Sequence, residues 1–250
     1  MLDSSKLRPD TRAVWLRLEH ELLLSGFVLV GGTALALRIG HRVSEDLDFA
    51  YLGDLLPVSR LQLLADRLRA GGMSFESNQD LAAEQEFENS GLALEEHQQN
   101  FLANRLVKVS FVRFGNAETR LLSGSENSPL RVATLDEIFK MKAIVCADRS
   151  KSRDWLDLYI LMTRYGYDIK DFHRAFPETG SQHNFTIAEM RLRSCKPNLL
   201  DEGYAGLADD LPSTEVMRAY FNDALDRLQV DLAREAFAAK KSAAPPPTDT

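Results

Sequence analysis

Two aspartates that lie one residue apart carry the clearest chemical signal in the sequence. Asp46 and Asp48 flank Leu47, and Phe49 follows. If this segment is a strand, both carboxylates lie on one face, about 6–7 Å apart, and the apolar residues lie on the other face. Two such carboxylates repel each other unless a cation lies beside them, and Mg²⁺ or Mn²⁺ prefers oxygen ligands of this kind. The alternative is a solvated acidic edge strand, which the apolar Leu47 and Phe49 disfavour.

A glycine turn precedes the two aspartates. Gly31, Gly32 and Thr33 follow a short apolar run, 27–30, and begin a run of strong helix formers that ends at residue 39. Glycines at a strand-to-helix turn let a ligand approach the backbone closely, and the free N–H groups at the start of a helix favour phosphate. Such turns also occur for structural reasons alone, so this one becomes informative only together with the aspartates. We expect Thr33 to be the N-cap of the helix.

Taken together, the two motifs resemble a known family. Thirteen residues lie between Gly32 and Asp46, and segments 31–37 (GGTALAL) and 41–49 (HRVSEDLDF) closely resemble the AbiEii/AbiGii family of bacterial toxin nucleotidyltransferases. The resemblance implies a nucleotidyltransferase-like fold, in which a mixed β-sheet is flanked by helices and the metal is bound by Asp46 and Asp48. We expect the triphosphate of an NTP to be bound by Gly31, Gly32, Thr33 and the loop residue Ser44.

A second pair of motifs lies downstream. Segments 134–143 (TLDEIFKMKA) and 148–159 (DRSKSRDWLDLY) resemble the later motifs of the same family, a lysine on a helix and an Arg-Asp-x-x-Asp-Leu helix start. The resemblance implies that Lys142 contacts the nucleotide phosphates and that Asp154 is a catalytic or site-organising acid.

Five basic residues lie within fourteen positions of this region. They are a candidate surface for the triphosphate or for an RNA backbone, and the alternative is a set of ordinary solvated helix faces with ion pairs. The five residues are Lys140, Lys142, Arg149, Lys151 and Arg153.

One position departs from the expected pattern. Many nucleotidyltransferases carry a third carboxylate on a later strand, and here the comparable strand has Ser110, whose hydroxyl is a much poorer metal ligand. Either the site works with two carboxylates and Asp154, or this is not the third-acid strand. Lys108 shares a face with Ser110, where it either approaches the nucleotide or is an exposed strand lysine. Three acids in a segment of uncertain structure are alternative substitutes for the missing ligand, Glu86, Glu88 and Glu95.

The wider pattern predicts an α+β protein in two parts. We expect a nucleotidyltransferase core at residues 1–130, a helical domain at 131–240 that contributes Lys142 and Asp154, and a disordered Pro-rich tail at 241–250. Thr134 and Glu137 predict a capping box at the start of the second part. The predicted strands are 27–30, 46–50, 106–114, 120–122 and 130–132, with further strands and an acidic loop within 73–101. The predicted helices are 9–25, 33–39, 57–70, 134–148, 152–165, 169–176, 185–194 and 213–240.

Composition limits the partners and the compartment. The chain has 250 residues, of which 44% are hydrophobic, and a formal net charge of −7. An acidic protein is poorly suited to non-specific nucleic-acid binding, although a local basic patch can still bind RNA. We find no signal-peptide apolar region and no run approaching the ~18 apolar residues of a membrane span, so we expect a cytoplasmic protein without membrane contact.

These observations predict a Mg²⁺-dependent enzyme that transfers a nucleotide from an NTP to an acceptor. The resemblance implies a toxin of a toxin–antitoxin system of the abortive-infection type, with a cognate antitoxin as partner. Because related toxins modify tRNA acceptor ends, it also implies that the acceptor is tRNA or another RNA. Two alternatives remain at this stage. One is a degenerate nucleotide-binding module without turnover, and the other is a phosphotransferase on the same fold, such as an antibiotic-modifying or kinase-like enzyme.

Overall fold

The computed structural model describes residues 2–122 and 130–243. The chain folds as two compact units. Unit one is Met1–Lys142 together with Ala205–Asp210, and unit two is Ala143–Tyr204 together with Leu211–Thr250. We expected a division near residue 130, whereas the units divide after Lys142, so this lysine belongs to unit one. The division into a nucleotidyltransferase core at 1–130 and a helical domain at 131–240 stays a prediction.

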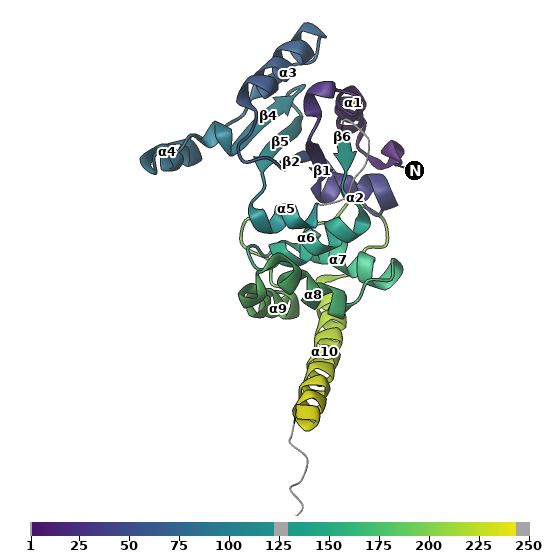
Figure 1. Ribbon diagram of the computed structural model, residues 1–250. Coiled ribbons are helices and arrows are strands. Elements are labelled where there is room, and N and C mark those ends of the chain that lie inside the picture. Colours follow the sequence, from purple (N-terminus) through teal and green to yellow (C-terminus); the bar gives the residue numbers. More distant parts are fainter. Residues whose placement is uncertain (1, 123–129, 244–250) are drawn as a thin grey trace, which may run out of the picture. The chain divides into compact units, whose positions relative to one another are not determined.

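Unit one is built on a mixed six-stranded sheet in the order β3-β4-β5-β2-β1-β6 (Figure 1). Strand β2 pairs antiparallel with β1 and parallel with β5, β1 pairs parallel with β6, and the pairs β3–β4 and β4–β5 are antiparallel. The predicted mixed sheet is therefore confirmed. The strands are β1 (Phe27–Val30), β2 (Leu47–Tyr51), β3 (Phe75–Ser77), β4 (Gln98–Ala103), β5 (Val107–Arg113) and β6 (Leu130–Val132).

One face of this sheet is the aromatic core of unit one. The ring of Phe111 stacks on Phe49 at 5.2 Å between centroids and meets the edge of Phe27 at 5.3 Å. Helix α3 (Val58–Ala70) lies on this face, since its Arg60 guanidinium is 5.4 Å from the centroid of the Phe27 ring. Because side chains alternate along a strand, the polar residues between these rings, including Asp48, lie on the opposite face.

The helices of unit one correct three predictions. Helix α1 (Pro9–Leu18) ends earlier than predicted, and a separate 3-10 turn (Leu22–Leu24) follows. Helix α2 (Gly31–Ile39) begins at Gly31 with Val30 at its N-cap position, so Thr33 lies inside the helix and is not its N-cap. The predicted strand at 120–122 is wrong, because helix α5 (Asn116–Leu121) occupies most of it.

The ambiguous segment 73–101 contains a helix between its strands. Helix α4 (Leu81–Asn89) begins after Asp80, whose carboxylate accepts hydrogen bonds from the backbone of Ala82 (2.9 Å) and Ala83 (3.4 Å). A side-chain oxygen at this position satisfies the otherwise unpaired amides of the first turn. A 3-10 turn (Leu94–Glu96) then leads into β4.

Helix α6 (Leu135–Val145) runs across the division between the units, and unit two is helical, as predicted. Aromatic side chains such as Trp155, Phe172, Phe176 and Phe221 form much of its core. No helix in the described ranges is long and apolar enough to cross a membrane. Helix α10 (Thr214–Ala243) includes residues 241–243, so the prediction of a disordered tail is wrong there, and the rest of the predicted tail at 241–250 lies outside the described residues. The helices of unit two are α7 (Ser152–Arg164), α8 (Ile169–Thr179), α9 (Phe185–Ser194) and α10 (Thr214–Ala243).

Candidate active site

The glycine turn and Asp48 lie against each other. Strand pairing places Val30 opposite Asp48, and Gly31 is the next residue along the chain. Gly31 has φ +72°, and a Cβ atom added to it would lie 2.9 Å from Oδ2 of Asp48. Glycine is therefore required here twice, by the left-handed backbone and by the close approach of the carboxylate. The glycine turn and Asp48 are therefore neighbours in the fold, and their joint role in binding a nucleotide stays a prediction.

The backbone of Asp46 is held by buried hydroxyls. The Thr33 hydroxyl lies 2.9 Å from the Ser44 hydroxyl and donates a hydrogen bond to the backbone carbonyl of Asp46. A hydroxyl has one proton and a carbonyl only accepts, so the Ser44 hydroxyl is the donor to Thr33. Both hydroxyls therefore tie the loop that precedes β2 to helix α2. The predicted contacts of Thr33 and Ser44 with a triphosphate stay predictions.

Two further contacts fix this loop from outside. The hydroxyl of Thr11 on α1 donates to the backbone carbonyl of Glu45 at 2.9 Å, and the Glu45 carboxylate pairs with Arg8. The backbone N–H of Val43 donates to the carbonyl of Leu207 at 2.7 Å. Segment 205–210 thus helps to hold the loop that precedes β2, although nothing in its sequence indicated this.

Arg42 is a functional candidate that the sequence analysis missed. Its side chain is buried, and its Nη2 lies 2.8 Å from the position that a Cβ atom on Gly32 would occupy. Its Nη1 donates to the carbonyl of Val43 at 3.1 Å. The guanidinium thus lies at the N-terminus of α2, where Val30 gives no side-chain cap. A guanidinium beside free backbone amides is a chemically suitable environment for a phosphate.

Ser110 lies directly beside Asp48 in the sheet. The two residues are Cα partners in the parallel pair of β2 and β5, and Asn100 of β4 is in turn the partner of Ser110. Ser110 is buried. At the level of Asp48, the neighbouring strand β5 therefore carries a hydroxyl, and the next strand, β4, carries an amide.

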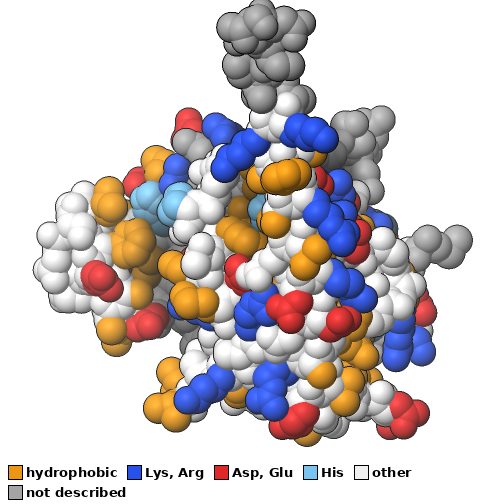
Figure 2. Space-filling view, turned by 90° about the horizontal axis from the view of Figure 1, so that it is seen from below, with side chains coloured by type: hydrophobic (Ala, Val, Ile, Leu, Met, Phe, Trp, Pro, Cys, Tyr) orange, Lys and Arg blue, Asp and Glu red, His pale blue; other side chains and the backbone are white. Residues whose placement is uncertain are grey.

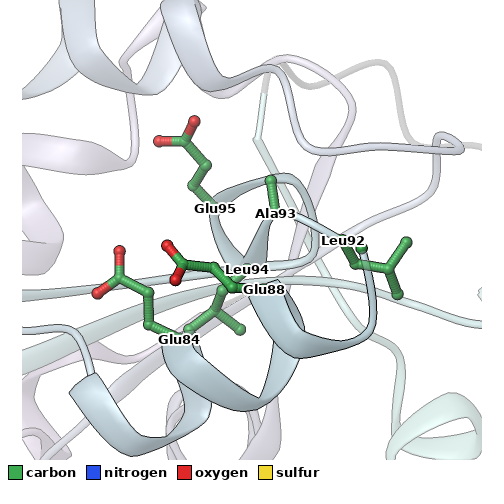
Figure 3. A pocket seen from close by; sticks show the side chains of 7 residues that line it. Glu84, Glu88, Leu92, Ala93, Leu94 and Glu95 are labelled. Carbon is green, nitrogen blue, oxygen red and sulfur yellow. The ribbon is translucent and has the colours of Figure 1, made fainter.

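The acids considered as substitutes for Ser110 lie elsewhere in unit one. Figure 3 shows Glu88 and Glu95 with Glu84 around a cavity of about 480 Å³ formed by α4 and the turn that follows it. Glu86 is also on α4. Within residues 2–122 and 130–243, no group of three or more His, Cys, Asp or Glu side chains is arranged to hold a metal ion. The carboxylate shown to lie at the glycine turn is that of Asp48.

Lys142 is positioned by a well-anchored helix. Thr134 and Glu137 form the predicted capping box, with hydrogen bonds of 3.2 Å to the Thr134 hydroxyl and 2.7 Å from the Thr134 N–H. Arg131 of β6 pairs with the same Glu137 carboxylate at 2.7 Å, and both side chains are buried. Lys142 itself is only 7% exposed. A lysine on a solvated helix face is rarely buried, so the alternative that Lys142 is an ordinary solvated lysine is disfavoured.

Asp154 has a defined partner within unit two. It lies in the first turn of α7, is only 2% exposed, and accepts two hydrogen bonds from Arg149, at 2.8 Å and 3.2 Å. Such a bidentate pair occupies both carboxylate oxygens. This geometry favours the site-organising role of Asp154, and its catalytic role stays a prediction.

The basic cluster is largely neutralised by carboxylates. Lys140 pairs with Asp136 at 3.0 Å, Arg149 with Asp154, and Arg153 with Glu202 at 3.2 Å. On the face shown in Figure 2, Lys and Arg side chains are interspersed with Asp and Glu rather than gathered in one field. Ion pairs therefore explain three of the five basic residues without a nucleic-acid partner. The six residues of these three ion pairs are Asp136, Lys140, Arg149, Arg153, Asp154 and Glu202.

Comparison with known proteins identifies the family. A family model described as nucleotidyl transferase AbiEii toxin, Type IV TA system, matches residues 13–243. The chain belongs to this family. The resemblance found in the motifs is thereby confirmed, and the protein is a nucleotidyltransferase. Family membership also implies a nucleotide substrate and an antitoxin partner.

Individual relatives of this AbiEii-family chain are distant. It is 25% identical over 186 residues to an uncharacterized protein of Aquifex aeolicus (strain VF5), which covers 73% of this chain and 80% of that protein. Among solved structures it is similar to JHP933 from Helicobacter pylori, with 14% identity, 98% and 100% of the two chains covered, and a TM-score of 0.47. MenT4, a nucleotidyltransferase toxin of Mycobacterium tuberculosis H37Rv, matches with 14% identity, 88% and 93% coverage, and a TM-score of 0.36.

Proposed function

We propose that this AbiEii-family enzyme transfers a nucleotide from an NTP to an RNA acceptor such as tRNA, with Mg²⁺ or Mn²⁺ at Asp46 and Asp48. The observation that carries the proposal is the 2.9 Å approach of the Asp48 carboxylate to the Cβ position of Gly31. This approach places a glycine turn that is suited to binding phosphate next to a carboxylate that is suited to binding a metal ion. A structural strand-to-helix turn has no need of that carboxylate.

The donor set fits a small divalent cation. Mg²⁺ is typically held by one or two carboxylates, with substrate phosphates and water completing its shell. Asp46 and Asp48 provide two carboxylates, and Thr33 and Ser44 fix the backbone from which the first of them projects. A third protein carboxylate is therefore not required for this kind of site. When bound, the ion would neutralise phosphate charge and lower the pKa of the attacking hydroxyl.

The residues of the chain then act chiefly by positioning. The backbone amides of the glycine turn and the Arg42 guanidinium hold the triphosphate, while Lys142 neutralises charge that develops on the phosphates. The acceptor hydroxyl oxygen bonds to the α-phosphorus, the bond from that phosphorus to the bridging oxygen breaks, and pyrophosphate leaves. The hydroxyl proton passes to water. Phosphoryl transfer needs little more from a protein than this positioning and electrostatic stabilisation.

The acceptor is the least constrained part of the proposal. An RNA acceptor is supported by the family resemblance, and the net charge of −7 together with the paired basic residues limits how much RNA backbone the chain can bind. We therefore expect recognition of a short RNA end rather than of a long backbone. A small antitoxin gene in the neighbouring reading frame would support the toxin role.

A labelling experiment tests the proposal. Each NTP, labelled at the α- or the γ-phosphate, is incubated with Mg²⁺ and either total RNA or cell protein, using wild type and Asp48→Asn. We expect α-label on RNA with wild type and at least a hundredfold less with Asp48→Asn. Retention of γ-label would instead identify a phosphotransferase, NTP binding without labelling would identify a degenerate module, and label on protein would refute an RNA acceptor.

A further inference from the structure

A second cavity opens on the same face of the sheet as Asp48. It has a volume of about 470 Å³ and is lined by β4, β5 and the segment around α4, including Gln98, Asn100 and Lys108. All of its residues belong to unit one. It is distinct from the acidic cavity of Figure 3, with which it shares only Leu94.

Asn100 has an unusual side chain in this cavity. It is 7% exposed, and its buried Oδ1 has no hydrogen-bond partner in the described part of the chain. A buried acceptor left without a donor is destabilising and rare in folded proteins. Such an atom is typical of a group that a ligand completes.

Two other polar side chains of the cavity wall, Gln79 and Asp80, form internal hydrogen bonds. The side-chain amide of Gln79 accepts from the backbone N–H of Asn100 at 3.0 Å and donates to the carbonyl of Gln98 at 3.2 Å. The Asp80 carboxylate caps helix α4. Asn100 differs from Gln79 and Asp80 because its buried side-chain oxygen has no hydrogen-bond partner in the described residues.

The location of Asn100 relates it to the reaction. Asp48, Ser110 and Asn100 are successive partners across three neighbouring strands, so their side chains lie on one face. Two strand spacings separate the first from the last, about 10 Å. This separation suits a nucleoside whose α-phosphate is held at Asp48.

We propose that this cavity is the nucleoside subsite, and that Asn100 selects the NTP by accepting a hydrogen bond from an exocyclic amino group of the base. The inference rests on the proposed nucleotide transfer. The lining favours an uncharged ligand, since its amides outnumber its two opposite charges, Asp80 and Lys108. A segment of RNA backbone would require several cations, whereas the described lining contains one.

The subsite predicts a preference among bases. Adenine, cytosine and guanine each present an exocyclic amino group as a donor, and uracil has none. An asparagine side chain is well suited to such a donor because its oxygen accepts with fixed geometry. We therefore expect ATP, CTP and GTP to bind more tightly than UTP.

Calorimetric titration separates this subsite from the phosphate site. Wild type, Asn100→Ala and Asn100→Asp are titrated with Mg²⁺ and α,β-methylene analogues of the four NTPs, and with inorganic tripolyphosphate. We expect Asn100→Ala to weaken binding of the ATP, CTP and GTP analogues by about tenfold or more, while binding of the UTP analogue and of tripolyphosphate is unchanged. Asn100→Asp keeps an acceptor at this position, so it should retain the preference for amino-bearing bases.

The stability of Asn100→Ala gives an independent readout. A structural asparagine would lower Tm when removed, whereas an asparagine whose oxygen has no partner should leave Tm unchanged or raise it. If all four analogues bind wild type no better than tripolyphosphate, the subsite is refuted and the phosphate site stands. Binding of the four analogues by Asn100→Ala with the base preference of wild type also refutes base selection by Asn100. If neither analogues nor tripolyphosphate bind, the proposed function itself fails.

Discussion

Substitution of Gly31 by alanine tests the link between the glycine turn and Asp48. Two costs are expected. The backbone at φ +72° places alanine in the left-handed region, which costs about 1–2 kcal/mol. The new methyl group would also meet Oδ2 of Asp48 at 2.9 Å, a distance that real Cβ contacts do not reach, so the carboxylate must move.

The two costs appear in different measurements. The backbone cost lowers the free energy of unfolding, which urea denaturation measures. The displacement of Asp48 lowers the rate of nucleotide transfer, because a misplacement of about 1 Å at a reacting centre can reduce a rate about a hundredfold. We therefore expect a modest loss of stability and a large loss of turnover under single-turnover conditions with saturating NTP.

Gly72 provides a matched control in the same unit. Its φ is +85°, and a Cβ atom added there has nothing within 4 Å. Gly72→Ala should therefore show the backbone cost alone, with normal turnover. In an Asp48→Ala background the collision at Gly31 is removed, so Gly31→Ala should then cost no more stability than Gly72→Ala. Wild-type turnover in Gly31→Ala would refute the reasoning. So would a stability cost of Gly31→Ala that exceeds that of Gly72→Ala by the same amount in the wild-type and the Asp48→Ala backgrounds.

Three further predictions concern the supports of the site and a buried thiol. Thr33→Val removes the hydrogen bond to the Asp46 carbonyl, so we expect a loss of about 1–3 kcal/mol in urea denaturation and a lower kcat; an unchanged kcat would show that Asp46 does not depend on this bond. Arg131→Met leaves the Glu137 carboxylate buried without its cation and should cost about 3–5 kcal/mol, and adding Glu137→Gln, which still caps the helix, should recover part of it; an equal loss in the double variant would contradict this account. Burial raises the pKa of the Cys195 thiol to about 12, so native protein at pH 8 should resist iodoacetamide at this residue until urea unfolds it, as followed by peptide mass spectrometry. Because the folded state disfavours the thiolate, Cys195 contributes stability that declines as pH rises above its unfolded pKa of 9.0, and rapid native alkylation would contradict the burial.

The parts of the site that sequence predicted are those fixed by local rules. The alternation around Asp46 and Asp48 gives the face of a strand, and the Gly31–Gly32 pair gives a turn into a helix. The pairing of Thr134 with Glu137 likewise follows from a short capping pattern. In each case the residues lie close together in the sequence, or they are linked by the motif spacing that is typical of the family.

The parts that sequence missed depend on contacts across the fold. Arg42 is buried beside the glycine turn only because the loop folds back onto α2, and no pattern in the loop distinguishes it from a solvated arginine. The unpartnered oxygen of Asn100 exists only because β4 pairs with β5. Helix α4 was missed for a different reason, since its many glutamates resemble an acidic loop, although Asp80 at its start is a capping signal that was available.

The hydroxyl at Ser110 is compatible with catalysis when the charge of the site is considered. The backbones of Ser110 and Asp48 are one strand spacing apart, about 4.8 Å, so a carboxylate in place of Ser110 would add a further negative charge beside Asp48. In the proposed site, one divalent cation would balance the two carboxylates, and Arg42 and the amides of the glycine turn would bind the phosphates of the substrate. A neutral Ser110, followed by the neutral Asn100, continues the same face without further repulsion of the triphosphate. The row from Asp48 to Asn100 therefore changes from charged to uncharged in the direction in which a nucleotide changes from phosphate to base.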